Sequence, residues 1–105
     1  MRLTDTEISD IGQAAKAVLP PGARVLLFGS RVDDSRRGGD VDLLVETPAL
    51  HSPEQVVRLQ RLLTAQLYRR WGERRIDVVV CAQGQSDARA VVAAARREGI
   101  ELART

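Results

Sequence analysis

The sequence has little cysteine, little lysine, few aromatic residues and no long apolar run. Cys81 is the only cysteine among the 105 residues, so the chain can form neither an internal disulfide nor a zinc-binding cysteine cluster. The N-terminal stretch MRLTDTEISD lacks the apolar core of a signal peptide. No segment approaches the ~20 apolar residues that a membrane span needs. We therefore expect a cytoplasmic protein without a membrane segment.

The charged residues are dense but nearly balanced, with 16 basic and 14 acidic side chains and a formal net charge of +2. Lys16 is the only lysine, so arginine supplies almost all of the positive charge. A net charge this small gives little support for nucleic acid as a direct ligand. The length suits one domain over residues 1–105, without room for a separate substrate domain.

Capping and turn residues divide the chain into alternating helices and strands. Thr4 and Glu7 form a capping-box pair that predicts the start of a helix, and Pro20 and Pro21 end it. Ile100 and Leu102 are expected to pack back onto the domain. The order indicates an α/β fold, a small mixed β-sheet of about three strands covered by about four helices. The remaining elements are strands at 24–28, 41–45 and 75–81, a helix capped by Ser52 and closed by Gly72, and a last helix capped by Ser86 and followed by Gly99.

Three aspartates interrupt strands that are otherwise apolar, at Asp40, Asp42 and Asp77. Aspartate is disfavoured in strands, and a carboxylate there needs a partner. Asp40 and Asp42 are two residues apart and share one face, and Asp77 lies at the same end if its strand runs parallel. Three carboxylates ~5 Å apart would repel by about 3 kcal/mol per pair, which a divalent cation would offset. Oxygen ligands alone favour Mg²⁺ or Mn²⁺. The alternative is an exposed acidic pair at a strand entrance.

Gly29 and Ser30 follow the first predicted strand directly and open a tight turn. Glycine lets the backbone approach a ligand closely, and free N–H groups with the Ser30 hydroxyl can bind a phosphate. A phosphate-binding turn beside a carboxylate metal site is the equipment of in-line phosphoryl or nucleotidyl transfer.

The segments LLFGSRVDDSRRGGDVDLLVE and RRIDVVV together resemble the signature of the polymerase-β-like nucleotidyltransferase superfamily. That signature is an apolar strand, Gly-Ser, a loop of about ten residues, Asp-x-Asp in a second strand and a third acidic residue in a later one. Either short motif alone is weak, but the combination is specific. The chain resembles most closely the MNT branch, the minimal nucleotidyltransferases.

The resemblance implies roles for individual residues. Gly29 and Ser30 would bind the triphosphate of ATP, helped by Arg31. Asp40 and Asp42 would bind Mg²⁺ or Mn²⁺, and Asp77 would be the third ligand and help to activate the acceptor hydroxyl. The loop departs from the family pattern, because Asp33 and Asp34 place negative charge near the expected triphosphate. Arg31, Arg36 and Arg37 are available to compensate for that charge.

Stand-alone MNT proteins are similar to the antitoxin of two-gene systems whose toxin is a HEPN protein, a helical RNase that the antitoxin adenylylates on tyrosine. The resemblance therefore implies a protein adenylyltransferase that moves AMP from ATP to a partner. A partner protein or a second copy of the chain would supply the acceptor site. The first alternative is a degenerate nucleotidyltransferase that masks its partner by contact alone, and the second is a nucleotide sensor.

Arginines gather around Gly72, at positions 69, 70, 74 and 75. A solvated rim of the domain explains such a cluster most simply. A patch that binds RNA or a partner is the alternative.

Overall fold

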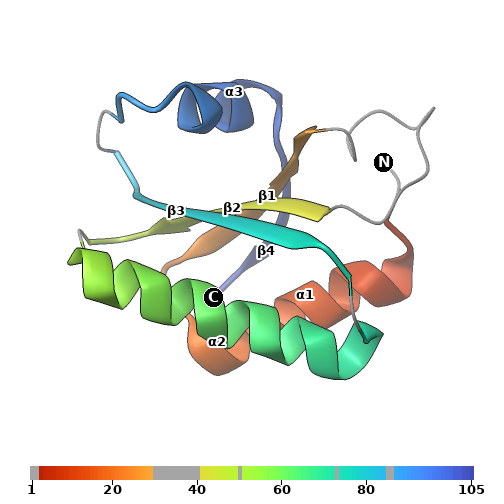
Figure 1. Cartoon of the computed structure of the whole chain (residues 1–105). Coiled ribbons are helices and arrows are strands. Elements are labelled where there is room, and N and C mark those ends of the chain that lie inside the picture. Colours follow the sequence, from red (N-terminus) through yellow and green to blue (C-terminus); the bar gives the residue numbers. More distant parts are fainter. Residues whose placement is uncertain (1–2, 30–40, 50, 73, 85–86) are drawn as a thin grey trace.

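The structure, a computed structural model, describes residues 3–29, 41–49, 51–72, 74–84 and 87–105. A four-stranded sheet of order β3-β2-β1-β4 has α1 and α2 on one face and α3 on the other (Figure 1). The α/β class predicted from the sequence is confirmed. The elements are α1 (Asp5–Val18), β1 (Arg24–Phe28), β2 (Val41–Thr47), α2 (Pro53–Trp71), β3 (Ile76–Ala82), α3 (Ala90–Glu98) and β4 (Ile100–Arg104).

The sheet is mixed because its two inner strands are joined to their neighbours in different ways. β1 pairs antiparallel with both β2 and β4. β2 and β3 pair in parallel, since α2 carries the chain back across the sheet between them. The parallel pairing on which the predicted position of Asp77 depended is therefore present. As a result, the N-terminal ends of β2 and β3 lie at the same end of the sheet as the C-terminal end of β1.

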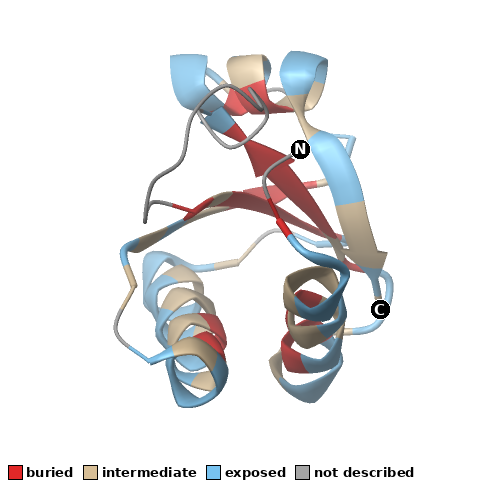
Figure 2. Cartoon of the chain, turned by 90° about the vertical axis from the view of Figure 1, so that its right-hand side faces the viewer, coloured by how far each residue is buried: buried red, intermediate tan, exposed pale blue. Residues whose placement is uncertain are grey.

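Two apolar layers bury the sheet, one on each face. The larger layer packs α1 and α2 against alternate residues of β1 and β2, such as Leu27 and Leu43. The smaller layer lies under α3 and includes Leu26, Leu44 and Cys81. Buried residues accordingly concentrate in the central strands and on the inner sides of the helices (Figure 2). No helix in the described ranges is long and apolar enough to cross a membrane.

Local signals predicted the helix starts well. Thr4 and Glu7 form a reciprocal capping box at α1, with Thr4 N–H donating to Glu7 Oε1 at 2.8 Å. Ser52 and Gln55 form the second at α2. Gly72, which caps the end of α2, has a positive φ of 74°, a conformation that glycine adopts without strain.

The C-terminal quarter differs from the prediction. The last helix begins at Ala90 rather than after Ser86, and its cap residue Arg89 makes no capping hydrogen bond through its side chain; Ser86 itself lies outside the described residues. Ile100 and Leu102 belong to β4, which pairs along β1. The described residues therefore form four strands and three helices, against an expectation of about three strands and four helices. Open backbone groups on β1 explain the fourth strand, because pairing satisfies them.

Candidate active site

Asp42 and Asp77 lie side by side on neighbouring parallel strands. The register of β2 and β3 pairs them directly, so their side chains leave the same face of the sheet. Asp42 is half-buried, and Asp77 is exposed at the start of the edge strand β3. Within the described residues no hydrogen bond or ion pair holds the Asp77 carboxylate. The structure thus brings together two of the three predicted carboxylates.

Gly29 completes this end of the sheet. β1 ends at Phe28, which pairs with Asp42, so the next residue turns directly above the Asp42 side chain. Gly29 has a φ of 75°, and a Cβ at this position would overlap the Asp42 carboxylate oxygen Oδ2. The glycine is therefore required twice, by its backbone conformation and by the close approach. This arrangement suits a ligand that contacts both the Gly29 backbone and the two carboxylates.

Ser30, Arg31 and Asp40 were predicted to complete the site, and all three lie outside the described residues. The described part of the chain contains no group of three histidine, cysteine, aspartate or glutamate side chains that could hold a metal. Asp42 and Asp77 nevertheless fit Mg²⁺ or Mn²⁺ in kind, because both are carboxylates and neither histidine nor cysteine stands beside them. Like charges on directly paired residues are unfavourable, so a divalent cation would stabilise the pair.

A second carboxylate arrangement on the same face escaped the sequence reasoning. Glu46, four residues after Asp42 on β2, is only 5% exposed at the opposite end of the sheet. Its oxygens accept from Arg24 Nε of β1 at 2.6 Å and from Arg96 Nε of α3 at 3.0 Å. Glu101 of β4 accepts from Arg24 Nη1 at 3.2 Å, which joins β4 to the same network. These ion pairs connect four elements.

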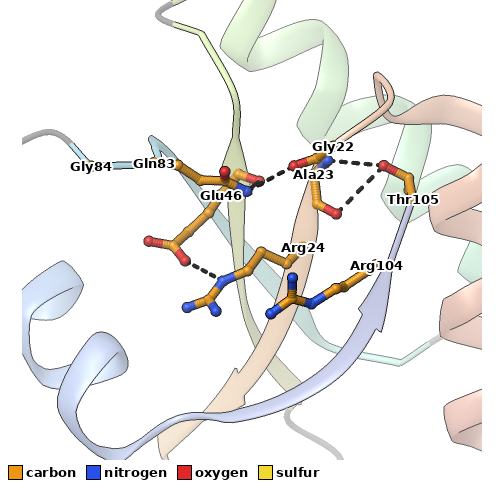
Figure 3. A pocket seen from close by; sticks show the side chains of 8 residues that line it. All are labelled: Gly22, Ala23, Arg24, Glu46, Gln83, Gly84, Arg104 and Thr105. Carbon is orange, nitrogen blue, oxygen red and sulfur yellow. Dashed lines mark hydrogen bonds and ion pairs between the residues drawn. The ribbon is translucent and has the colours of Figure 1, made fainter.

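A pocket of about 380 Å³ opens beside this network (Figure 3). Arg24 and Arg104 project into it from β1 and β4, where they are direct partners in the register. Like charges opposite each other are unfavourable, and Glu101 offsets them by pairing with both arginines. The charges of Arg24 and Arg104 are therefore paired within the chain. This pocket lies away from Asp42 and Asp77. A signal in the sequence was available, since Glu46 is a glutamate inside an apolar strand.

The arginine cluster around Gly72 is partly a structural joint. Arg74 forms an ion pair with Glu7 of α1, and its guanidinium lies 4.7 Å from the centroid of the Trp71 ring. Trp71 Nε1 donates to Asp10 of α1 at 2.9 Å. Arg70 lies 3.8 Å from the same aspartate. Arg70 and Arg74 therefore fasten the end of α2 to α1, which a solvated rim alone does not describe.

Comparison with solved structures supports the architecture. A crystal structure of the toxin-antitoxin MntA-HepT matches with a TM-score of 0.62 at 17% identity, over 97% of this chain and 74% of that chain. A crystal structure of the toxin-antitoxin with AMP-PNP matches with a TM-score of 0.65 at 19% identity, over 93% of this chain and 73% of that chain. No protein-family model matches, and no curated protein matches in sequence.

The similarity to these structures concerns the fold. The mixed sheet and the pairing of Asp42 with Asp77 are observed in the chain itself. The chain therefore has the fold of the minimal nucleotidyltransferase antitoxins of MntA-HepT type.

Proposed function

We propose that this chain is a Mg²⁺-dependent nucleotidyltransferase that transfers AMP from ATP to a hydroxyl of a partner protein, and that it thereby acts as an antitoxin in the cytoplasm. The observation that carries the proposal is the direct pairing of Asp42 with Asp77 beneath the Gly29 turn. The fold is that of toxin-antitoxin structures, one of which has AMP-PNP. We propose further that residues 1–105 form one nucleotidyltransferase domain.

Each side chain has a distinct task in this proposal. Asp42 and Asp77, with Asp40, would hold Mg²⁺ or Mn²⁺. The bound metal supplies charge stabilisation for the phosphoryl oxygens and orients the reacting groups. The Gly29 backbone would approach the triphosphate, and Ser30 and Arg31 would contribute a hydroxyl and a positive charge. The narrow turn excludes any larger residue at Gly29.

Asp77 is more exposed than Asp42, and this supports a separate role for it in the proposal. It stands at the edge of the sheet, where an acceptor from another protein can reach it. The acceptor oxygen forms a bond to the α-phosphorus while the bond from that phosphorus to the bridging oxygen of the β-phosphate breaks. Pyrophosphate leaves, and the hydroxyl proton passes to the Asp77 carboxylate. An AMP ester on the partner results.

The experiment incubates the chain with ATP labelled in the α-phosphate, Mg²⁺ and the protein encoded beside its gene. We expect a labelled protein band and an added AMP by mass spectrometry. Asp77→Asn keeps the shape of the side chain but removes its charge, so labelling should fall by more than about 10²–10³-fold, the typical loss for one charge-stabilising contact. Absence of transfer by the wild-type chain, with ATP and Mg²⁺ saturating, would refute the proposal.

A second candidate function rests on Asp33 and Asp34, which add negative charge near the expected triphosphate. A chain with too little affinity for nucleotide would mask its partner by contact alone. Growth of cells that carry the toxin decides between the two. A masking protein protects equally well as wild type and as Asp77→Asn at matched expression, whereas the enzyme loses protection.

A further inference from the structure

We infer that the groove between α2 and the outer edge of β3 is the docking surface for the acceptor protein. This inference rests on the proposed function and specifies where its protein substrate binds. The occupant is a segment that presents an apolar side chain, a neighbouring carboxylate and the hydroxyl to be modified.

The groove has a volume of about 410 Å³. It is lined by one flank of α2, including Gln60, Arg61, Thr64, Ala65 and Tyr68, and by Ile76, Asp77 and Val78 of β3. The flank is distinct from the buried stripe of α2, which holds Leu63 and Leu67 against the sheet. Both walls belong to regular elements, so the groove is formed in the free chain.

The open backbone edge of β3 is already occupied by side chains. Gln60 Nε2 donates to the Val78 carbonyl at 2.8 Å, and Arg89 Nη2 donates to the Val80 carbonyl at 2.9 Å. Arg96 Nη2 does the same for the Ala82 carbonyl at 2.9 Å. An added strand would need these carbonyls. The groove therefore receives side chains, and the acceptor does not extend the sheet along this edge.

Tyr68 and Arg61 give the groove its chemistry. Tyr68 is 44% exposed, although a large aromatic side chain gains from burial, and aromatic residues are enriched where proteins bind each other. Next to it, Ala65 leaves room for an apolar side chain. Arg61 makes no ion pair within the described residues, so its guanidinium is available to a carboxylate of the partner.

The position of Asp77 links the groove to the reaction. Ile76 and Val78 face α2, whereas Asp77 faces the other side of the same edge strand and lies at the rim of the groove. A segment packed against α2 therefore needs only to pass the edge of β3 to bring its hydroxyl to the Asp77 carboxylate. Among the strands of the described residues none intervenes, because β3 is the outermost strand of the sheet.

Two substitutions test the groove, each with a matched control on the same helix. Arg61→Glu reverses the free charge, and Arg58→Glu makes the same change at an exposed position outside the groove. Tyr68→Ala removes the aromatic wall, and Leu62→Ala truncates a side chain that is 38% exposed but does not line the groove. The affinity of each full-length variant for the protein encoded beside the gene is measured by calorimetry without nucleotide, and AMP transfer is measured separately.

We expect Arg61→Glu and Tyr68→Ala to raise the Kd for that protein by at least about tenfold. The two controls should bind as wild type, and the KM for ATP should stay unchanged in all four. Equal affinity for all variants overturns the inference, and so does a wild-type chain that does not bind the neighbouring protein. Weakened binding by the two groove variants, together with no AMP transfer by wild type, upholds the groove and refutes the proposed function.

Discussion

The two ends of β2 hold carboxylates on the same face of the sheet, and these carboxylates have different surroundings. At the far end Glu46 is buried and two arginines reach its oxygens from β1 and α3. At the near end Asp42 pairs across the sheet with another carboxylate, Asp77, and no arginine of the described residues forms an ion pair with Asp77. The first carboxylate is neutralised from within the fold. The second pair has adjacent like charges.

The difference shows how to separate a structural acid from a functional one. A buried charge without a partner is too costly to keep, so Glu46 is explained by its two arginines. Asp77, by contrast, has no ion pair among the described residues and lies beside the like charge of Asp42, an arrangement suited to binding a cation. The comparison therefore predicts that changes at Glu46 lower stability, whereas changes at Asp42 and Asp77 alter ligand response.

Glu46→Gln should have the largest effect on stability. It removes the buried charge that Arg24 and Arg96 share, although Arg24 keeps its ion pair with Glu101, and breaking a buried pair costs about 3–5 kcal/mol when both groups are buried. The arginine side chains are 32% and 28% exposed, so we expect about 2–3 kcal/mol. In a domain of this size each kcal/mol shifts the Tm by about 4–8 °C.

Thermal unfolding measures this loss, with Glu98→Gln as the control. Glu98 pairs with Arg97 at 3.5 Å, but both side chains are more than 60% exposed, at 64% and 69%. Removal of such a surface pair should change stability by less than about 1 kcal/mol. Similar losses for both variants would show that the Glu46 network is not the joint that its contacts indicate.

Metal bound at Asp42 and Asp77, at the other end of β2 from Glu46, should stabilise the chain. Mn²⁺ at about 100 times its Kd would add ~2.7 kcal/mol to the free energy of unfolding. Asp42→Asn should remove most of this gain, because it removes one of the carboxylates proposed to bind the metal. Glu46→Gln should keep the response. An unchanged Tm of the wild type between EDTA and saturating Mn²⁺ contradicts the metal site.

Gly29 and Gly72 form a natural pair for a finer test. Their φ values are 75° and 74°, so the backbone disfavours alanine at both positions. A Cβ at Gly72 meets nothing within 4 Å, whereas one at Gly29 meets the Asp42 carboxylate. Gly29→Ala should therefore be more destabilising by about 1 kcal/mol in urea unfolding and should weaken the Mn²⁺ response. Equal effects of the two substitutions would show that Asp42 moves aside freely.

The smallest effect concerns pH at the joint between α1 and α2. Burial alone would raise the pKa of Glu7, but the backbone of Thr4 and the guanidinium of Arg74 hold it below the ordinary value of 4.5. The stabilisation is therefore present above pH 4.5 and is lost as the pH falls through the lowered pKa. Glu7→Gln should reduce stability by less than about 1 kcal/mol at pH 7 and make no difference at the acid end. If the stability difference between wild type and Glu7→Gln instead grew at acid pH, the pKa of Glu7 would not be lowered by folding.

The sequence located the elements whose determinants are local. Capping pairs at Thr4 and Ser52, the proline stop after α1 and the short apolar strands all depend on neighbours a few residues apart. The candidate site was also readable, because Asp42 and Asp77 stand in strands where carboxylates are rare. Their position at one end of the sheet depended on parallel strands, which a crossover helix of this length allows. The resemblance to the MNT family pointed to the same residues.

Tertiary structure decided what depends on distant partners. Whether Ile100 and Leu102 form a loose tail or a strand depends on the open edge of β1, about 75 residues earlier in the chain. The same holds for Glu46, whose role is set by Arg24 and Arg96. The sequence by itself determined the first two helices, the first three strands and the presence of Asp42 and Asp77 in two of those strands. Only the packing of segments far apart in the chain decided the fourth strand, the buried ion pairs and the covered edge of β3, because charges and backbone groups are satisfied by neighbours in space.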